Sequence, residues 1–261
     1  MVENPVLVVV NDEAISIADM LRSMGVDDNL RLLDQYAQQR LIVQLARESG
    51  LEISREDIQH TVNEWRYRHR LECVEDTEGW LMQRGIGLED VAWDAEARLL
   101  ETRLRAQVTA DQIEPHFVQH RLDFDEADVC WIYVEDEGMA EEIQIQVHEG
   151  GINFYGFARR HSQDERTRPA GGYLGRIRRS HLPKGIAPLV FAAEPKTVVG
   201  PFKVDRGFAL YLVQRHYPAA LTEDIQKEIR KQLFKRWIKK EMRKANITFP
   251  WLAETEQREI A

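Results

Sequence analysis

Ser162-Gln163-Asp164, followed shortly by Gly171-Gly172-Tyr173-Leu174-Gly175, is the stretch around which this chain is organised. It joins an acidic side chain to a glycine-rich turn, and the apolar residues Leu182 and Phe191 follow it. No glycine-rich loop stands between a strand and a helix, as a phosphate-binding site requires. The stretch therefore predicts a peptide-binding site, which either grips a peptide or does chemistry on it.

The composition narrows the class of protein. The chain has 261 residues, a formal net charge of -9 and 43% hydrophobic residues, enough for one large or two modest domains. The acidic balance argues against nucleic acid as a partner. No apolar run approaches the ~20 residues of a membrane span, and no cationic leader precedes Val6–Val10, so we expect a cytoplasmic protein without stable membrane insertion. Cys73 and Cys130 are far apart and predict neither a disulfide nor a zinc site.

Helical periodicity dominates the first 120 residues. Apolar residues recur at three- and four-residue steps over 30–48 and again over 88–107, and Ser54-Arg55-Glu56-Asp57 resembles a capping box that begins another helix. Shorter helices are expected after Ser16, over 78–83 and after Thr109. The valine-rich run 6–10, which ends at the turn pair Asn11-Asp12, is the one strand expected here.

The pattern changes after residue 120. Strands are expected over 129–134, 198–203 and 208–213, the last two joined as a hairpin at Asp205-Arg206-Gly207. Helices are expected around 140–147, over 154–160 and over 188–193, with the glycine stretch as a loop. The apolar stripe of a last helix, 222–244, requires a partner surface, for which the first region is the natural candidate. We therefore expect an α+β protein with a helical domain (1–120), a module with a small, mainly antiparallel sheet (121–217), and a C-terminal helix (218–261) that packs on the helical domain.

Several segments together resemble the parvulin-type peptidyl-prolyl isomerases with the domain plan of the SurA and PrsA foldases. The opening segment Val8–Ile15 and the segment Val108–Ile113 resemble the start and the end of the SurA-type N-terminal domain. In this chain, Phe154–Asp164 resembles the second-helix signature of the family. Gly171–Gly175 resembles the family's Gly-Gly-Asp-Leu-Gly turn. Further landmarks fall at Phe191, Gly200-Pro201-Phe202 and Arg206-Gly207-Phe208. The resemblance spans nearly the whole chain.

The chain departs from the family at two histidines. Trp131 stands where the first strand of the family usually has one, and Ala209 where the last strand has the other. Tyr173 replaces the aspartate of the glycine turn, whereas Asp164 occupies a position that the family fills with Asp or Cys. One large and one small residue in place of two histidines keep the total volume roughly constant, so we interpret this pair as structural and expect reduced turnover.

The resemblance implies isomerisation of Xaa-Pro bonds in unfolded or flexible client polypeptides, without cofactor or metal. Its implied catalytic residues are Asp164 and Ser162, at the polar edge of a proline slot. The implied substrate-binding residues are Leu174, Leu182, Ile186, Phe191, Trp131, Arg206 and Phe208. The alternative is a catalytically weak or inactive chaperone or escort that binds a precursor peptide during maturation or export. The acidic loop Glu135-Asp136-Glu137 argues against phosphoserine-proline as the substrate.

Two weaker patterns complete the interpretation. His116 and His120 have the spacing of a metal pair, but Pro115 disturbs their helix and no HExxH pattern is present, so no metal site is predicted. The last helix carries many lysines and arginines, which predict a solvated face paired with carboxylates, or else a surface for an acidic partner.

Overall fold

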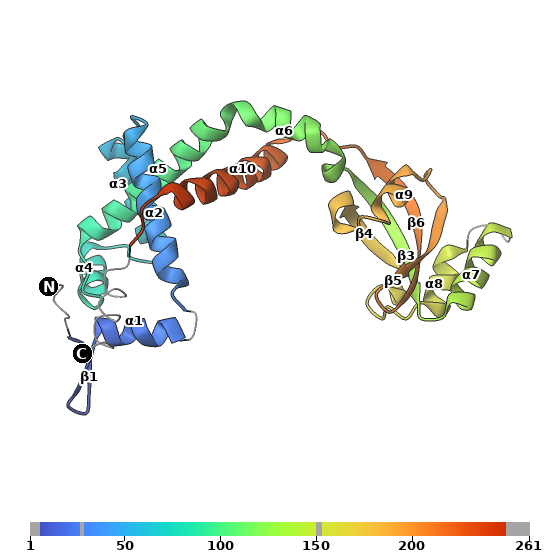
Figure 1. The fold of residues 1–261 in the computed structure, drawn as a ribbon, viewed down its shortest axis with the longest axis horizontal. Coiled ribbons are helices and arrows are strands. Elements are labelled where there is room, and N and C mark those ends of the chain that lie inside the picture. Colours follow the sequence, from blue (N-terminus) through green and yellow to red (C-terminus); the bar gives the residue numbers. More distant parts are fainter. Residues whose placement is uncertain (1–5, 27–28, 150–152, 249–261) are drawn as a thin grey trace, which may run out of the picture. The chain divides into compact units, whose positions relative to one another are not determined.

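The computed structural model describes residues 6–26, 29–149 and 153–248 (Figure 1). The chain forms two compact units: Met1–Gln112 with Arg230–Ala261, and Ile113–Ile229. The sequence predicts domain borders after residues 120 and 217, whereas the units divide after 112 and 229. Within the described ranges, no helix is both long enough and apolar enough to cross a membrane.

The first unit opens with a β-hairpin. Strand β1 (Val6–Val10) pairs antiparallel with β2 (Glu13–Ser16). Asn11 and Asp12 between them have φ angles of 46° and 70°, the left-handed conformation that a tight two-residue hairpin turn requires. The expectation of a single strand in this region was therefore wrong, because such a turn sends the chain back alongside β1.

Helices make up most of the rest of the first unit. Ser54 caps one of them by accepting a hydrogen bond from the Asp57 amide, as the sequence predicts. A buried cluster joins Ile42, Leu100 and Leu104 to Phe234 and Ile238 of the last helix. The helices of this unit are α1 (Ile17–Val26), α2 (Arg31–Glu48), α3 (Arg55–Arg68), α4 (Val74–Met82), α5 (Leu88–Thr109) and, from Arg230 on, α10 (Glu223–Lys244).

The second unit is built on a four-stranded sheet of order β4-β3-β6-β5, in which all neighbours are antiparallel. The central strands β3 and β6 pair along their length, so they carry side chains to both faces of the sheet. The strands are β3 (Glu126–Val134), β4 (Tyr173–Arg178), β5 (Val198–Val204) and β6 (Gly207–Tyr217). The helices are α6 (Ile113–His120), α7 (Glu137–Glu149), α8 (Phe154–His161) and α9 (Ala187–Ala192).

The glycine stretch is partly a strand, whereas the sequence analysis expects a loop throughout. Tyr173 is the first residue of β4, and just before it the Gly172 carbonyl accepts a hydrogen bond from the Trp131 amide (2.8 Å). Gly172 has φ +82°, and a Cβ there would lie 2.1 Å from the Trp131 carbonyl oxygen. Only glycine fits, so this residue brings β4 against β3.

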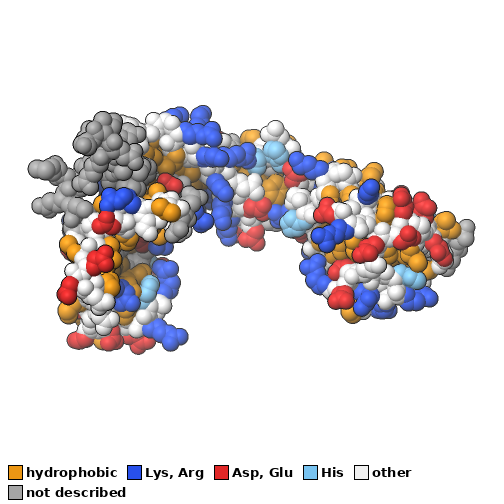
Figure 2. Space-filling view, turned by 60° about the horizontal axis from the view of Figure 1, so that its bottom comes forward, with side chains coloured by type: hydrophobic (Ala, Val, Ile, Leu, Met, Phe, Trp, Pro, Cys, Tyr) orange, Lys and Arg blue, Asp and Glu red, His pale blue; other side chains and the backbone are white. Residues whose placement is uncertain are grey.

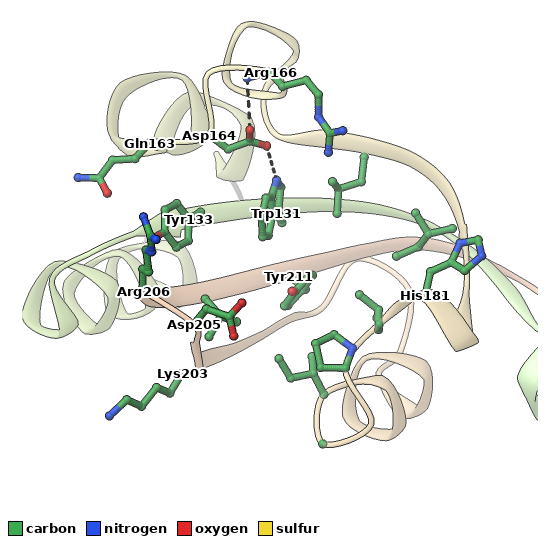
Figure 3. Close-up of a pocket in the computed structure, with 17 residues that line it drawn as sticks. Trp131, Tyr133, Gln163, Asp164, Arg166, His181, Lys203, Asp205, Arg206 and Tyr211 are labelled. Atoms are coloured by element: carbon green, nitrogen blue, oxygen red, sulfur yellow. Dashed lines mark hydrogen bonds between the residues drawn. The ribbon is translucent and has the colours of Figure 1, made fainter. Parts of the chain in front are cut away.

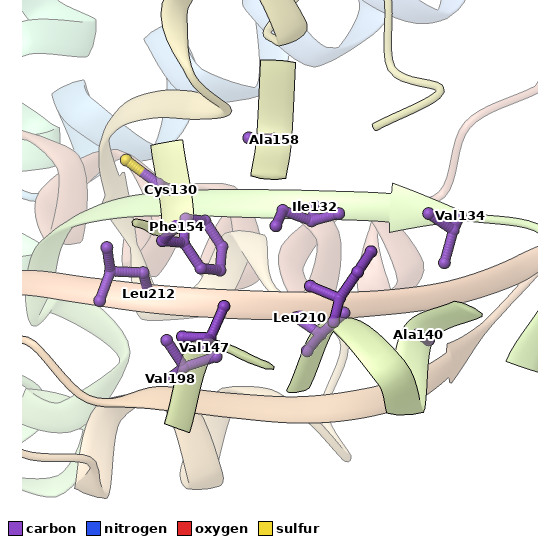
Figure 4. Close-up of a cluster of buried hydrophobic side chains, with 11 residues drawn as sticks. Cys130, Ile132, Val134, Ala140, Val147, Phe154, Ala158, Val198, Leu210 and Leu212 are labelled. Atoms are coloured by element: carbon purple, nitrogen blue, oxygen red, sulfur yellow. The ribbon is translucent and has the colours of Figure 1, made fainter. Parts of the chain in front are cut away.

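Apolar residues cover the two faces of the sheet differently. On one face, Cys130, Ile132 and Val134 of β3 meet Leu210 and Leu212 of β6 under the two helices α7 and α8 (Figure 4). On the other face, the strand side chains pack with residues of the short helix α9 and of the segment before it. One face is thus covered by helices, and the other retains room for a ligand.

We predict that Gly172→Ala destabilises the second unit far more than Gly175→Ala. Gly175 has nearly the same φ, +84°, but a Cβ there meets nothing within 4 Å. The left-handed backbone alone costs roughly 1–2 kcal/mol for an L-residue. The additional clash at Gly172 should raise the loss to roughly 3 kcal/mol or more. Hydrogen exchange of the β3 amides measures both losses, and equal losses would refute the close approach.

Candidate active site

The candidate site lies on the open face of the central strands. Side chains alternate along a strand, so Trp131 and Tyr133 of β3 share this face with Ala209 and Tyr211 of β6. The strand register pairs Trp131 with Tyr211 and Tyr133 with Ala209. Trp131, Tyr133 and Tyr211 form the floor of a groove of about 1050 Å³, whereas Ala209 is fully buried and does not line it.

Apolar and polar side chains both line the groove, and Figure 3 shows the labelled polar ones at several of its margins around Trp131 and Tyr211. Its volume exceeds that of a single proline ring and suits a peptide segment of several residues. The apolar wall comes from β4 and from the segment that leads into α9: Leu174, Ile177, Leu182, Pro183 and Ile186. Polar side chains at the other margins belong to Gln163, Asp164, Arg166, His181, Lys203, Asp205 and Arg206.

Asp164 is held by three donors. Its Oδ2 accepts hydrogen bonds from the indole Nε1 of Trp131 (2.9 Å) and from the hydroxyl of Thr167 (2.5 Å). Its Oδ1 accepts one from the backbone amide of Arg166 (3.3 Å). The Thr167 hydroxyl also accepts from Trp131 Nε1 (3.0 Å). The carboxylate therefore ties the turn after α8 to the side chain of a central strand.

These contacts control the ionisation of Asp164. Partial burial alone would raise its pKa, but the hydrogen bonds from Thr167, Trp131 and the Arg166 amide outweigh that effect. The positive charge of Arg166 adds to them, and together they lower the pKa. Asp164 is consequently a carboxylate at neutral pH, which matches its role as an acceptor for all three donors.

Ser162 does not belong to the groove. It is buried, with 1% of its surface exposed, and its Oγ accepts a hydrogen bond from the Tyr133 amide (3.2 Å). The neighbouring Gln163 amide donates to the Tyr133 carbonyl (2.8 Å). Ser162 therefore joins the end of α8 to β3. The prediction that it lies at the polar edge of the proline slot is wrong.

The predicted substrate-binding residues divide into two groups. Five line the groove: Trp131, Leu174, Leu182, Ile186 and Arg206. Phe208 and Phe191 do not. Phe208 precedes Ala209 on β6, so strand alternation turns it to the face covered by α7 and α8. Phe191 packs in the open-face cluster with its ring 5.9 Å from that of His216, outside the groove lining.

Tyr211 is the main residue that the sequence analysis missed. The period-two pattern from Ala209 could have revealed it, because the second residue along a strand returns to the same face. Tyr133, on the same face as Trp131, follows from the same rule. The remaining missed residues, among them Arg166, His181 and Lys203, come from turns and strand ends whose positions no periodicity specifies.

Charges of both signs surround the groove. Arg166, Lys203 and Arg206 are positive, whereas Asp164 and Asp205 are negative. Figure 2 shows Lys, Arg, Asp and Glu side chains intermingled on the visible face of the second unit.

Comparisons with known proteins agree with this architecture. Residues 134–215 match the family model of rotamases described as the PPIC-type PPIase domain. The matched segment begins just after Trp131 and contains Asp164, the apolar wall of the groove and Tyr211. No curated protein matches the chain.

Solved structures extend the likeness over nearly the whole chain. The peptidylprolyl isomerase PrsA from Bacillus cereus has a TM-score of 0.56 and 17% identity, with 94% of each chain covered. PrsA from Bacillus anthracis has a TM-score of 0.49 and 18% identity, covering 84% of this chain and 99% of that one. A PpiC-type isomerase domain is 26% identical over 39% of this chain and 99% of its own length, with a TM-score of 0.36. The chain thus carries a PPIC-type, or parvulin-type, peptidyl-prolyl isomerase domain within a fold like that of PrsA.

Proposed function

We propose that the protein is a foldase whose groove binds flexible Xaa-Pro segments of client polypeptides and accelerates their cis-trans isomerisation. The observation that carries the proposal is the apolar wall of Leu174, Leu182 and Ile186, which lines the same groove as Trp131 and Asp164. Such a wall accepts the pyrrolidine ring, and the polar side meets the peptide backbone. The PPIC-type family match of residues 134–215 supports the same activity.

The reaction needs no covalent intermediate. Rotation about the prolyl amide bond is slow because resonance resists twisting, with a barrier of roughly 18–20 kcal/mol. A site accelerates it by binding the twisted amide more tightly than either planar form. An apolar groove contributes by fixing the ring while the preceding carbonyl turns, and by removing water that stabilises the planar amide.

A second candidate function is client binding without turnover. The observation that favours it is the arrangement at Trp131, which stands where the family usually has a histidine and uses its indole N–H on Asp164. Asp164 in turn already accepts three hydrogen bonds. A chaperone of this kind would suppress client aggregation yet leave the exchange rate of Xaa-Pro peptides unchanged.

An acidic partner, if it binds, would contact the lysines and arginines of α10 and not the groove. Lys227 pairs with Asp224 and Lys244 with Glu241, both within the helix itself. Such exposed pairs contribute little to stability and leave these lysines able to exchange partners. Binding of an acidic polypeptide to this helix stays a prediction.

We predict that Leu182→Arg lowers the isomerisation rate at least tenfold, because a charged side chain would occupy the proline slot. Leu189→Arg is the matched control, since Leu189 lies on α9, is 53% exposed and does not line the groove. NMR exchange spectroscopy on a series of Xaa-Pro peptides measures both rates. Equal rates in the two variants would exclude this groove as the site, and no acceleration by the unsubstituted protein would favour the chaperone.

We predict that the Asp164 carboxyl group titrates below its ordinary value of 3.8 in the folded protein. A lowered pKa means that Asp164 stabilises the fold above the unfolded pKa of about 3.9, and that this contribution is lost as pH falls through the folded pKa. Carbon-13 NMR of the aspartate side chains measures the midpoint, and Asp164→Asn assigns the signal. A midpoint at or above 3.8 would contradict the hydrogen-bond arrangement.

A further inference from the structure

The hydroxyl group of Tyr211 is a feature of the groove floor that the fold does not explain. The residue is 3% exposed, yet it lines the groove, at the centre of the residues drawn in Figure 3. Among the described residues, no hydrogen bond involves its hydroxyl group. The ring is buried, but the hydroxyl oxygen keeps some accessible surface in the groove, because it is not among the fully buried side-chain atoms that lack a partner. With no partner in the protein, the O–H is available to donate to a ligand that enters the groove.

The surroundings hold the Tyr211 ring without engaging its oxygen. The ring lies between aromatic neighbours, with centroids 6.1 Å from Trp131 and 6.1 Å from Phe202. Neither neighbour offers the hydroxyl an acceptor, since the Trp131 indole N–H is a donor and is already bound to Asp164 and Thr167. Rigid packing and a free O–H together make a fixed donor.

Burial also sets the protonation state of this group. Desolvation raises the pKa of Tyr211 above its usual value near 10, so the phenol carries its proton at neutral pH. Asp164, by contrast, is ionised and has its acceptors occupied. The two residues therefore differ in role. Asp164 holds the Trp131 indole, and Tyr211 has a hydroxyl proton that no protein group accepts and that a ligand can accept.

The chemistry of the twisted amide indicates what this donor binds. In the planar amide the nitrogen lone pair is delocalised into the carbonyl group, so the nitrogen is a poor acceptor. Twisting localises the lone pair on nitrogen and reduces the negative charge on oxygen. A donor aimed at the nitrogen therefore stabilises the twisted form selectively, whereas one aimed at the oxygen would favour the planar form.

We infer that Tyr211 is a catalytic residue whose hydroxyl group donates a hydrogen bond to the prolyl nitrogen in the twisted state. The inference rests on the proposed isomerase function and deepens it by assigning a donor on the groove floor. It gives the site a means of catalysis in a chain with Trp131 and Ala209 in place of the two family histidines. No bond is made or broken, and the proton stays on Tyr211.

The test is Tyr211→Phe, which removes the oxygen and retains the ring. Loss of an interaction made only in the twisted state should lower kcat about tenfold, equivalent to about 1.4 kcal/mol, and leave KM within about twofold. The matched control is Tyr155→Phe, because the Tyr155 hydroxyl accepts only a 3.4 Å hydrogen bond from Gln214 and lies outside the groove lining. Its kcat should equal that of the unsubstituted protein.

Stability measurements separate catalysis from packing. Removal of a hydroxyl that bonds no protein group should leave β6 amide exchange unchanged or slower, whereas a structural role would make it faster. An unchanged kcat in Tyr211→Phe, or a fall in kcat that accompanies faster β6 exchange, would overturn the inference while leaving the isomerase function intact. Absence of any acceleration by the unsubstituted protein would overturn both.

Discussion

The hydrogen bond from the Trp131 indole to the Asp164 carboxylate is the interaction on which the site depends. It joins the central strand β3 to the turn after α8, and Thr167 and the Arg166 amide complete the same cluster. The Trp131 backbone is held at the same point, since its amide donates to Gly172. One residue thus fixes both the polar margin of the groove and the approach of β4, which carries the apolar wall.

The two residues that replace the histidines of the resembled family have different roles in this arrangement. At one position, Trp131 combines packing with a specific hydrogen bond, so it does more than fill volume; at the other, Ala209 is fully buried on the groove side of β6. Helices α7 and α8 cover one face of the sheet, whereas the other face carries the short helix α9 and the groove, so the polar groups that can meet a peptide lie on that second face. Ionised Asp164 holds the scaffold through Trp131, and in the mechanism that we infer the Tyr211 hydroxyl donates to the ligand.

The parts of the fold that could be predicted from the sequence are those with a clear local pattern, such as helical periodicity or a capping residue. Helical periodicity indicates α2 and α5, and the Ser54 cap appears as expected. Strands β2 and β4 were missed because each follows a left-handed turn, at Asn11-Asp12 and at Gly171-Gly172, and neither is an apolar run of its own. In the site, Leu182, Ile186 and Asp164 line the groove and their roles stay predictions, whereas Ser162 and Phe208 lie outside it because neither motif spacing nor resemblance specifies the face to which a side chain turns. Tyr211 follows from strand alternation once the register of β6 is known.

The most direct test of this account is to follow the six tryptophan indole N–H signals by nitrogen-15 NMR while a flexible Xaa-Pro peptide is added. Trp131 lies on the floor of the groove, and its indole proton is bonded to Asp164, whereas Trp65 and Trp80 pack against each other in the helical unit. The account predicts that the Trp131 signal shifts and saturates with the peptide while those of Trp65 and Trp80 stay in place. A shift of the Trp65 and Trp80 signals with an unmoved Trp131 would contradict it.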